Sequence, residues 1–338
     1  MKPYYMGEPM RRRDLIKIFA GLPSLVPLAA YSQPAKRQIG VLMGIAPTDS
    51  QGQEGLTAFK TTLGDLGWVD GRNVQVDVRW GEANVGRMQD FAKELVALKP
   101  DVILGQTTQA VAALQRETKT IPIVFVVVSD PVGSGFVEGL PHPGGNITGF
   151  VNVESSLAGK WIEVLKDIAP RAKHAALMFN ADTATYSNYY IKPFEAAAQF
   201  QGVEPIVAPV RNDGEIERLI ASFDGSSTGV VSMPDAFIAS RHNLDLIVTL
   251  AARHRIPAIY PYRFMVAAGG LISYGIDTVD LYRRAAGYID RILNGAKPAD
   301  LPVQLPTRFE MTVNLKTARA LGIEMPATLL GHADEVFE

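Results

Sequence analysis

Residues 100–135 contain the pattern that most constrains what this chain can fold into. An apolar run, a short amphipathic segment and a second apolar run follow one another there. Strand-length apolar runs separated by one helical segment are typical of a parallel β-α-β unit. The polar residues after the first run are Thr107 and Thr108, and those after the second are Ser129 and Asp130. Because the carboxyl ends of parallel strands share one edge of a sheet, these side chains are expected to face one crevice that binds a ligand.

The same alternation of strand-like and helix-like segments continues along the chain. A segment rich in glycine and proline, residues 131–145, interrupts it, and it restarts near Gly149. A late helical segment between extended links indicates that the chain returns to its first half and crosses back. The predicted fold class is therefore α/β, with two doubly wound parallel-sheet lobes joined by a three-strand hinge. The expected strands and extended pieces are residues 39–43, 73–80, 147–153, 175–179, 205–210, 229–233, 258–260, 271–274 and 310–314, and the expected helices are 52–66, 84–98, 157–168, 186–201, 213–223, 238–254, 277–293 and 315–321.

The expected domain division follows from those crossings. Residues 38–148 and 276–302 are assigned to lobe one, and residues 149–275 and 303–338 to lobe two. Residues 1–32 have the pattern of a signal peptide, in which basic residues around Arg12 and Arg13 precede an apolar run too short for a spanning helix. The paired arginines resemble a twin-arginine signal, which exports a folded protein.

Composition narrows the class and the location of the protein. With 47% hydrophobic and 20% charged residues, the chain is typical of a soluble globular protein. A formal net charge of −2 gives no basic face for nucleic acid, so no nucleic-acid partner is expected. The sequence has no cysteine, which excludes disulfides and an acylated lipoprotein cysteine. We therefore expect a periplasmic protein that is soluble and has no lipid anchor.

Catalytic and cofactor motifs are absent from the sequence. It contains no phosphate-binding GxxxxGK[ST] loop, GxSxG elbow or HExxH zinc motif. The glycines at 133 and 135 do not extend into a dinucleotide fingerprint, because Glu138 stands where the third glycine belongs. The 5 histidines lack the spacing of metal ligands. No catalytic residue, cofactor or metal is predicted.

Thr107 and Thr108 are the sharpest candidates for ligand contact. Threonine commonly caps a helix, which is one sufficient explanation of both residues. The same position also offers free N–H groups, a hydroxyl and the positive end of a helix dipole. Those groups can bind a carboxylate without any arginine or lysine.

Asp130 and Asp235 follow predicted strands in the two lobes. Each can simply begin a turn, as Asp-Pro does at Asp130. An aspartate at the crevice can also hold an ammonium group through a charge-assisted hydrogen bond. We favour Asp235 for the ammonium group and Asp130 for shaping its loop.

Asn180, Tyr260 and Tyr274 complete the candidate ligand-binding residues. Asn180 follows the predicted strand 175–179 and is either a turn residue or a ligand contact. Tyr260 and Tyr274 are expected where the lobes meet. A tyrosine ring there can cover an apolar or aromatic group while its hydroxyl bonds polar groups.

Several segments together resemble one known family across nearly the whole mature chain. Their order resembles the type I periplasmic binding proteins, in the branch of ABC-transporter substrate-binding proteins that includes aromatic-amino-acid (tryptophan and tyrosine) binders. The segments are IGVLM (39–43), LGWVDGRN (66–73), PIVF (122–125), DPVG (130–133), PGGNITG (143–149), GLISYG (270–275) and NLKTA (314–318).

The resemblance implies a function without chemistry. It implies a monomeric solute-binding component of an ABC uptake transporter that closes about a hinge on a small organic ligand, such as an aromatic amino acid. Its partner would be an ABC permease in the inner membrane. Two alternatives stay open from the residues alone: an exported α/β enzyme and the ligand-sensing module of a membrane receptor.

Overall fold

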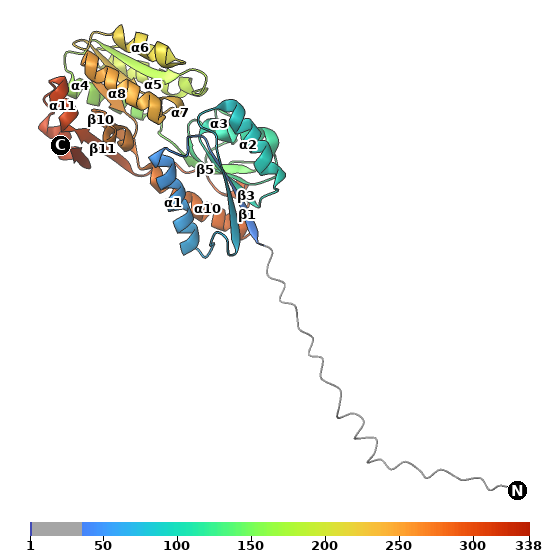
Figure 1. Cartoon of the computed structure of the whole chain (residues 1–338). Coiled ribbons are helices and arrows are strands. Elements are labelled where there is room, and N and C mark those ends of the chain that lie inside the picture. Colours follow the sequence, from blue (N-terminus) through green and yellow to red (C-terminus); the bar gives the residue numbers. More distant parts are fainter. Residues whose placement is uncertain (2–35) are drawn as a thin grey trace. The chain divides into compact units, whose positions relative to one another are not determined.

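Two separate β-sheets organise the part of the chain that the computed structural model describes, which is Met1 and residues 36–338 (Figure 1). We call the elements around the first sheet lobe one and those around the second lobe two. Lys36–Glu338 form one unit. The expected signal peptide, residues 1–32, lies outside the described residues apart from Met1. No helix in the described part combines the length and apolar character needed to cross a bilayer.

Lobe one is a sheet of 5 parallel strands in the order β2-β1-β3-β4-β5. The connection from β1 to β2 runs in one direction along the sheet, and the connections from β2 to β3 and from β3 to β4 run in the other. Because such crossovers are right-handed, α1 lies on one face of the sheet and α2 and α3 lie on the other. Helix α10 packs beside α1, as Figure 1 shows, and it also packs against β4. The elements are β1 (Arg37–Met43), α1 (Ser50–Asp65), β2 (Val74–Trp80), α2 (Val85–Ala97), β3 (Val102–Gln106), α3 (Thr108–Glu117), β4 (Ile123–Val128), β5 (Ile147–Val151) and α10 (Thr278–Leu293).

Lobe two is a sheet of 7 strands in the order β12-β11-β10-β9-β8-β6-β7. All of its pairs are parallel except β10 with β11. Helix α4 packs on α5, and α6 packs on α8. The elements are α4 (Leu157–Ile168), β6 (His174–Asn180), α5 (Ser187–Phe200), β7 (Glu204–Val210), α6 (Asp213–Ala221), β8 (Thr228–Ser232), α7 (Ala236–Ala239), α8 (Arg241–His254), β9 (Ala258–Tyr260), α9 (Arg263–Ala267), β10 (Ile272–Ile276), β11 (Phe309–Asn314), α11 (Leu315–Leu321), α12 (Ala327–His332) and β12 (Glu335–Phe337).

The chain passes between the two sheets three times: after β5, after β10, and between the 3₁₀ turn η1 (Pro298–Asp300) and β11. Strand β5 continues the lobe-one sheet to Val151. In the third crossing, Gln304 N donates to Gly149 O at 2.9 Å, and Val303 N donates to Leu140 O at 2.7 Å. The division of residues at 148 and 302 stays a prediction, while the α/β fold of two parallel-sheet lobes is confirmed.

The apolar patterns of the sequence account for the elements. Strand β4 reads IVFVVV and all its residues are buried, as in a parallel sheet covered on both faces. In α1, Leu56, Phe59 and Leu63 recur at helical spacing and are buried. The ring of Tyr282 in α10 lies so close to Gly55 that a Cβ there would stand 2.4 Å from it. Glycine at 55 therefore allows α1 and α10 to approach.

The structure differs from the expected elements mainly in lobe two. The expected helix 238–254 is two helices, α7 and α8, separated at Ser240, which has an extended backbone with ψ 145°. Helix α9 and the C-terminal elements α12 and β12 have no counterpart among the expected elements. All three are short, at 5, 6 and 3 residues, so they carry little periodicity.

Candidate ligand-binding site

Each sheet has one point at which the strand order reverses. In lobe one this point lies between β1 and β3, and in lobe two between β6 and β8. Ligands of doubly wound sheets bind outside the carboxyl ends of the strands at such a point. A cavity of about 20 Å³ lies at the carboxyl ends of strands of both sheets, because its lining includes Gln106 at the end of β3, Thr107 directly after it, and Asp235 after β8. We call it the inner cavity.

Residues 106–109, which we call the lobe-one wall, begin helix α3. Thr107 has φ +80° and ψ 154°, a conformation that is essentially confined to glycine. Its hydroxyl accepts a long hydrogen bond of 3.5 Å from Ala110 N. Gly44 at the end of β1 lies against this turn, since a Cβ there would stand 2.2 Å from Thr107 Oγ1, and Gly44 N donates to Gln106 Oε1 at 2.7 Å. The wall is thus fixed from the neighbouring strand.

A second unusual backbone conformation lies at the end of β4. Val127 has φ +55°, which is an outlier for a β-branched residue, and the β4–β5 register shifts between Val126 and Val128. Thr107 N donates to Val126 O at 3.2 Å, so the two strained turns are joined. Bulges of this kind re-aim a side chain next to a functional site. Val127 indeed lines the inner cavity.

The hydroxyl of Thr108 is used within the protein. It accepts from Ser129 N at 3.2 Å. The Ser129 hydroxyl in turn lies 2.9 Å from the Tyr190 hydroxyl of α5 in lobe two. Because Tyr190 donates its proton to Val153 O, Ser129 is the donor to Tyr190. This chain of hydrogen bonds joins the two lobes beside the inner cavity.

Asp235 forms the centre of the lobe-two wall, residues 234–236. It is 3% exposed and caps helix α7. Its Oδ2 accepts from Asn180 N at 2.6 Å, and its Oδ1 accepts from Thr183 Oγ1 at 2.7 Å and Phe237 N at 2.9 Å. Burial raises the pKa of Asp235 to about 6, against the lowering effect of these hydrogen bonds. The side chain is therefore mostly a carboxylate at neutral pH, with acceptor capacity left on Oδ2.

Asn180 and Asp130 shape loops beside the cavity. Asn180 Oδ1 accepts from Asp182 N at 2.9 Å and Thr183 N at 3.0 Å, which makes Asn180 the turn residue of the loop after β6. Asp130 has φ +47°, and its Oδ1 accepts from Gly133 N at 2.9 Å. Neither residue is among those that line the inner cavity.

The structure does not bring Tyr260 and Tyr274 to the inner cavity. Tyr260 is the last residue of β9, is 1% exposed and packs against Gly270 in the core of lobe two. Tyr274 is in the middle of β10, and its ring stacks on Phe309 with a centroid distance of 6.4 Å. Tyr274 does not reach the carboxyl end of its strand, because β10 continues for two residues beyond it, to Ile276.

Other polar residues line the cavity instead. Gln106 and Gln109 lie on the lobe-one wall, and Asn152, Tyr186 and Tyr262 also line the cavity. Asn152 and Tyr262 exchange hydrogen bonds: Asn152 Nδ2 donates to the Tyr262 hydroxyl at 2.8 Å, and that hydroxyl donates to Asn152 Oδ1 at 3.1 Å. Gln106 and Asn152 follow or end strands, so the rule used for Thr107 could have found them. Tyr186 lies six residues beyond the end of β6, so that rule cannot find it.

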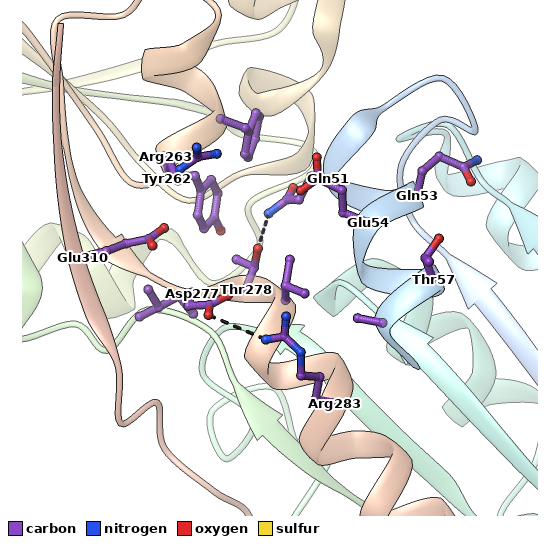
Figure 2. A pocket seen from close by; sticks show the side chains of 14 residues that line it. Gln51, Gln53, Glu54, Thr57, Tyr262, Arg263, Asp277, Thr278, Arg283 and Glu310 are labelled. Atoms are coloured by element: carbon purple, nitrogen blue, oxygen red, sulfur yellow. Dashed lines mark hydrogen bonds and ion pairs between the residues drawn. The ribbon is translucent and has the colours of Figure 1, made fainter. Parts of the chain in front are cut away.

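Two larger cavities, of about 640 and 400 Å³, adjoin the inner cavity. Gln51, near the start of α1, lines all three. Figure 2 shows the larger one, with Gln51 and Glu54 projecting from α1 on one side and Tyr262 and Arg263 on the other. Gln51 Nε2 donates to Thr278 Oγ1 of α10 at 3.1 Å.

Charged side chains gather in these two outer cavities. The larger one contains Asp277, Arg283 and Glu310, and burial raises the pKa of Glu310. The smaller one contains Asp49 and Arg241, and burial likewise raises the pKa of Asp49, against the effect of the Ala46 and Arg241 N–H groups and the Arg241 charge. Within the described residues, no cluster of acidic and histidine side chains could hold a metal ion. The inner cavity differs, because among residues 36–338 Asp235 is the only carboxylate that lines it, and no lysine or arginine of that range lines it.

The comparison with known families identifies the chain. Residues 41–337 match the family described as ABC transporter substrate binding protein. The chain therefore belongs to this family, which agrees with the resemblance of its segments.

Individual relatives share the fold and part of the sequence. The tyrosine-binding protein of Clostridioides difficile (strain R20291) is 27% identical over 266 residues, which are 79% of this chain and 76% of that protein. A Streptococcus pneumonia ABC domain solved with L-Trp is 27% identical over 90% of this chain and 100% of that chain, with a TM-score of 0.83. The ligand-free, open structure of a Clostridium difficile substrate binding protein is 26% identical over 89% of this chain and 99% of that chain, with a TM-score of 0.67.

Proposed function

We propose that this substrate-binding protein takes an aromatic α-amino acid between its lobes and delivers it to an ABC permease. The observation that carries the proposal is the opposite polarity of the two walls of the inner cavity. The lobe-one wall presents the positive end of helix α3 without any charged side chain, and the lobe-two wall presents the carboxylate of Asp235. A zwitterion matches this pair of walls.

The carboxylate of the ligand is expected at the lobe-one wall. The first N–H groups of a helix have no partner within the helix, and the helix dipole favours an anion there. Thr107 caps Ala110 N only at 3.5 Å, so this helix end stays available. Thr107 thus keeps the ligand-contacting role expected for it, while Thr108 supports the wall through Ser129.

The ammonium group of the ligand is expected at Asp235. Three donors hold this carboxylate in place, yet they do not use all the acceptor positions of its two oxygens. A hydrogen bond between an ammonium and a carboxylate contributes roughly 1.5–3 kcal/mol. Asn180 supports this ammonium site indirectly, because its N–H donates to Asp235. Asp130 orders the loop after β4.

The aromatic side chain of the ligand is expected against Tyr186 and Tyr262. Both rings line the inner cavity, together with apolar Ile45, Val127 and Pro234. Rings of this kind cover an apolar group while their hydroxyls stay hydrogen-bonded. The names of the relatives, which refer to tyrosine and L-Trp, support this ligand class. Tyr260 and Tyr274 are not proposed for this role, because neither lines the inner cavity.

Opening and closing of the lobes is the proposed mechanism. The inner cavity of about 20 Å³ has room for about one water molecule, so an amino acid enters only when the walls move apart. The three crossings between the sheets would act as the hinge, and ligand contacts on both walls would favour the closed arrangement. The higher TM-score against the L-Trp complex than against the open structure supports this view.

We further infer the location and partners from the sequence. Residues 1–32 would be a twin-arginine signal that exports the protein to the periplasm, where it would act as a soluble monomer. The permease in the inner membrane would bind the closed protein. No chemistry is required of any residue in this scheme.

A thermal-shift screen of the mature protein tests the ligand class. A ligand at a hundred times its Kd adds about 2.7 kcal/mol of stability, which raises the Tm of a domain this large by roughly 5 °C. We expect L-tryptophan or L-tyrosine to give such a shift, and sugars to give none. A shift by sugars or carboxylic acids without any shift by amino acids would show that the ligand class is wrong.

A further inference from the structure

We propose that the side-chain amide of Gln109 binds the carboxylate of the ligand and so sets the specificity of the site. This inference rests on the proposed function, because it assumes an amino-acid ligand in the inner cavity. Gln109 is the second residue of α3 and lines that cavity with the rest of the lobe-one wall. The residue therefore lies beside the helix end at which the carboxylate is expected.

The first argument is an unused hydrogen-bond donor. Gln109 Nε2 is buried, and it has no hydrogen-bond partner among residues 36–338. Buried polar atoms in folded proteins are nearly always paired, so an orphaned donor in a cavity wall needs an explanation. A ligand oxygen that accepts from Nε2 when the lobes close supplies one.

The second argument comes from four other side chains that line the cavity and donate hydrogen bonds. Gln51 Nε2 donates to Thr278 Oγ1 at 3.1 Å, and the Tyr186 hydroxyl donates to Pro234 O at 2.7 Å. Asn152 and Tyr262 donate to each other. These donors already serve the protein. Gln109 can bind a ligand without breaking any of these bonds.

The third argument is the charge of the lobe-one wall. A carboxylate bound there meets no lysine or arginine from the described part of the chain, so neutral donors must balance its charge. Free N–H groups at the start of α3 supply part of that balance. The Gln109 amide lies on the same turn of helix and adds a donor that can reach the same ligand oxygen or its neighbour.

Two substitutions separate a donor role from a structural one. Gln109→Met keeps the length of the side chain and removes the amide, and Gln109→Glu replaces the amide by a carboxylate. The matched control is Gln115→Met on the same helix, because Gln115 Nε2 donates to Gly135 O at 2.7 Å, outside the cavity. Thermal unfolding of each variant shows whether it folds.

The measurement is titration calorimetry of each variant with L-tryptophan and with L-tryptophanamide, which lacks the carboxylate. In Gln109→Met we expect L-tryptophan to bind about tenfold more weakly, and L-tryptophanamide to change by less than about twofold, as for a lost charge-assisted hydrogen bond. Gln109→Glu should weaken L-tryptophan by roughly a hundredfold through repulsion between like charges. Gln115→Met should bind both probes as the wild type does.

The outcomes distinguish this inference from the proposed function. If the wild type binds L-tryptophan and Gln109→Met binds it equally well, or loses both probes to the same extent, the role of Gln109 is wrong and the function stands. Unchanged binding of L-tryptophan by Gln109→Glu also refutes the role, because a carboxylate in contact with the ligand carboxylate would repel it. If the wild type binds no amino acid, both proposals are wrong. The ratio of the two affinities does not depend on the fraction of folded protein, so a partly unfolded variant still gives an answer.

Discussion

The two walls of the inner cavity occupy equivalent places in their lobes and differ in charge. Each follows a strand at the point where the strand order reverses, and each begins a helix. In lobe one, the neutral Thr107 caps α3 only weakly, at 3.5 Å. In lobe two, the anionic Asp235 caps α7 at 2.9 Å and accepts two further hydrogen bonds.

This difference shows how similar folds produce opposite polarity. A helix end that keeps a neutral cap stays positive and attracts an anion. A helix end capped by a buried carboxylate carries a net negative charge at neutral pH, and this charge attracts a cation. The identity of the capping residue therefore determines which end of a zwitterion each lobe binds.

Replacing Asp235 by Asn should have a large effect on binding. The change removes the charge and keeps the shape, so L-tryptophan should bind roughly 10- to 100-fold more weakly. Indole-3-propionate, which lacks the amine, should lose less than about threefold, and titration calorimetry measures both. Equal losses for the two ligands would remove the contrast between the walls. Asparagine caps a helix about as well as aspartate, so the cap of α7 is kept in this variant.

Acidification tests the same carboxylate without a mutation. Burial raises the pKa of Asp235 to about 6. Below pH 6 the group becomes neutral, so the affinity for L-tryptophan should fall by up to about tenfold per pH unit. Asp235→Asn should not show this component of the pH profile. An identical profile in wild type and variant would show that another group titrates.

The folding free energy should have its own pH dependence. Because the pKa of Asp235 in the folded protein lies above its model value of 3.8, the folded state binds more protons between these two pKa values. The contribution of Asp235 to stability is therefore greatest below pH 4 and decreases as the pH rises to about 6. Denaturant unfolding of the wild type and of Asp235→Asn between pH 4 and 7 measures this contribution as the difference between their unfolding free energies.

Tyr262→Phe should have a smaller effect, on the stability of the region beside the inner cavity. It removes the hydroxyl that Asn152 contacts beside the first crossing and leaves Asn152 without those partners. We expect a loss of about 1–3 kcal/mol in unfolding free energy. The control is Tyr288→Phe, whose hydroxyl donates to Pro302 O outside the inner cavity and is exposed. If both variants lose the same stability, the Asn152–Tyr262 contact has no special weight.

The sequence predicts the strands and the strand-end residues better than the side-chain directions. Apolar runs such as β4 are evident in the sequence. The rule that ligands bind where the strand order reverses then points to Thr107 and Asp235. The same reasoning failed to place Tyr274, because the face it occupies depends on the register of β10 against β11. Periodicity also gives no sign of the positive φ at Val127, which arises from the bulge against β5.

The paired polarity of the walls is tested most directly by three related ligands. Calorimetry at pH 7.5 would compare L-tryptophan with indole-3-propionate, which lacks the ammonium group, and with tryptamine, which lacks the carboxylate. We predict that L-tryptophan binds at least about tenfold more tightly than either, because only the zwitterion satisfies both walls. Equal affinity for L-tryptophan and one of the single-charged compounds would contradict the account.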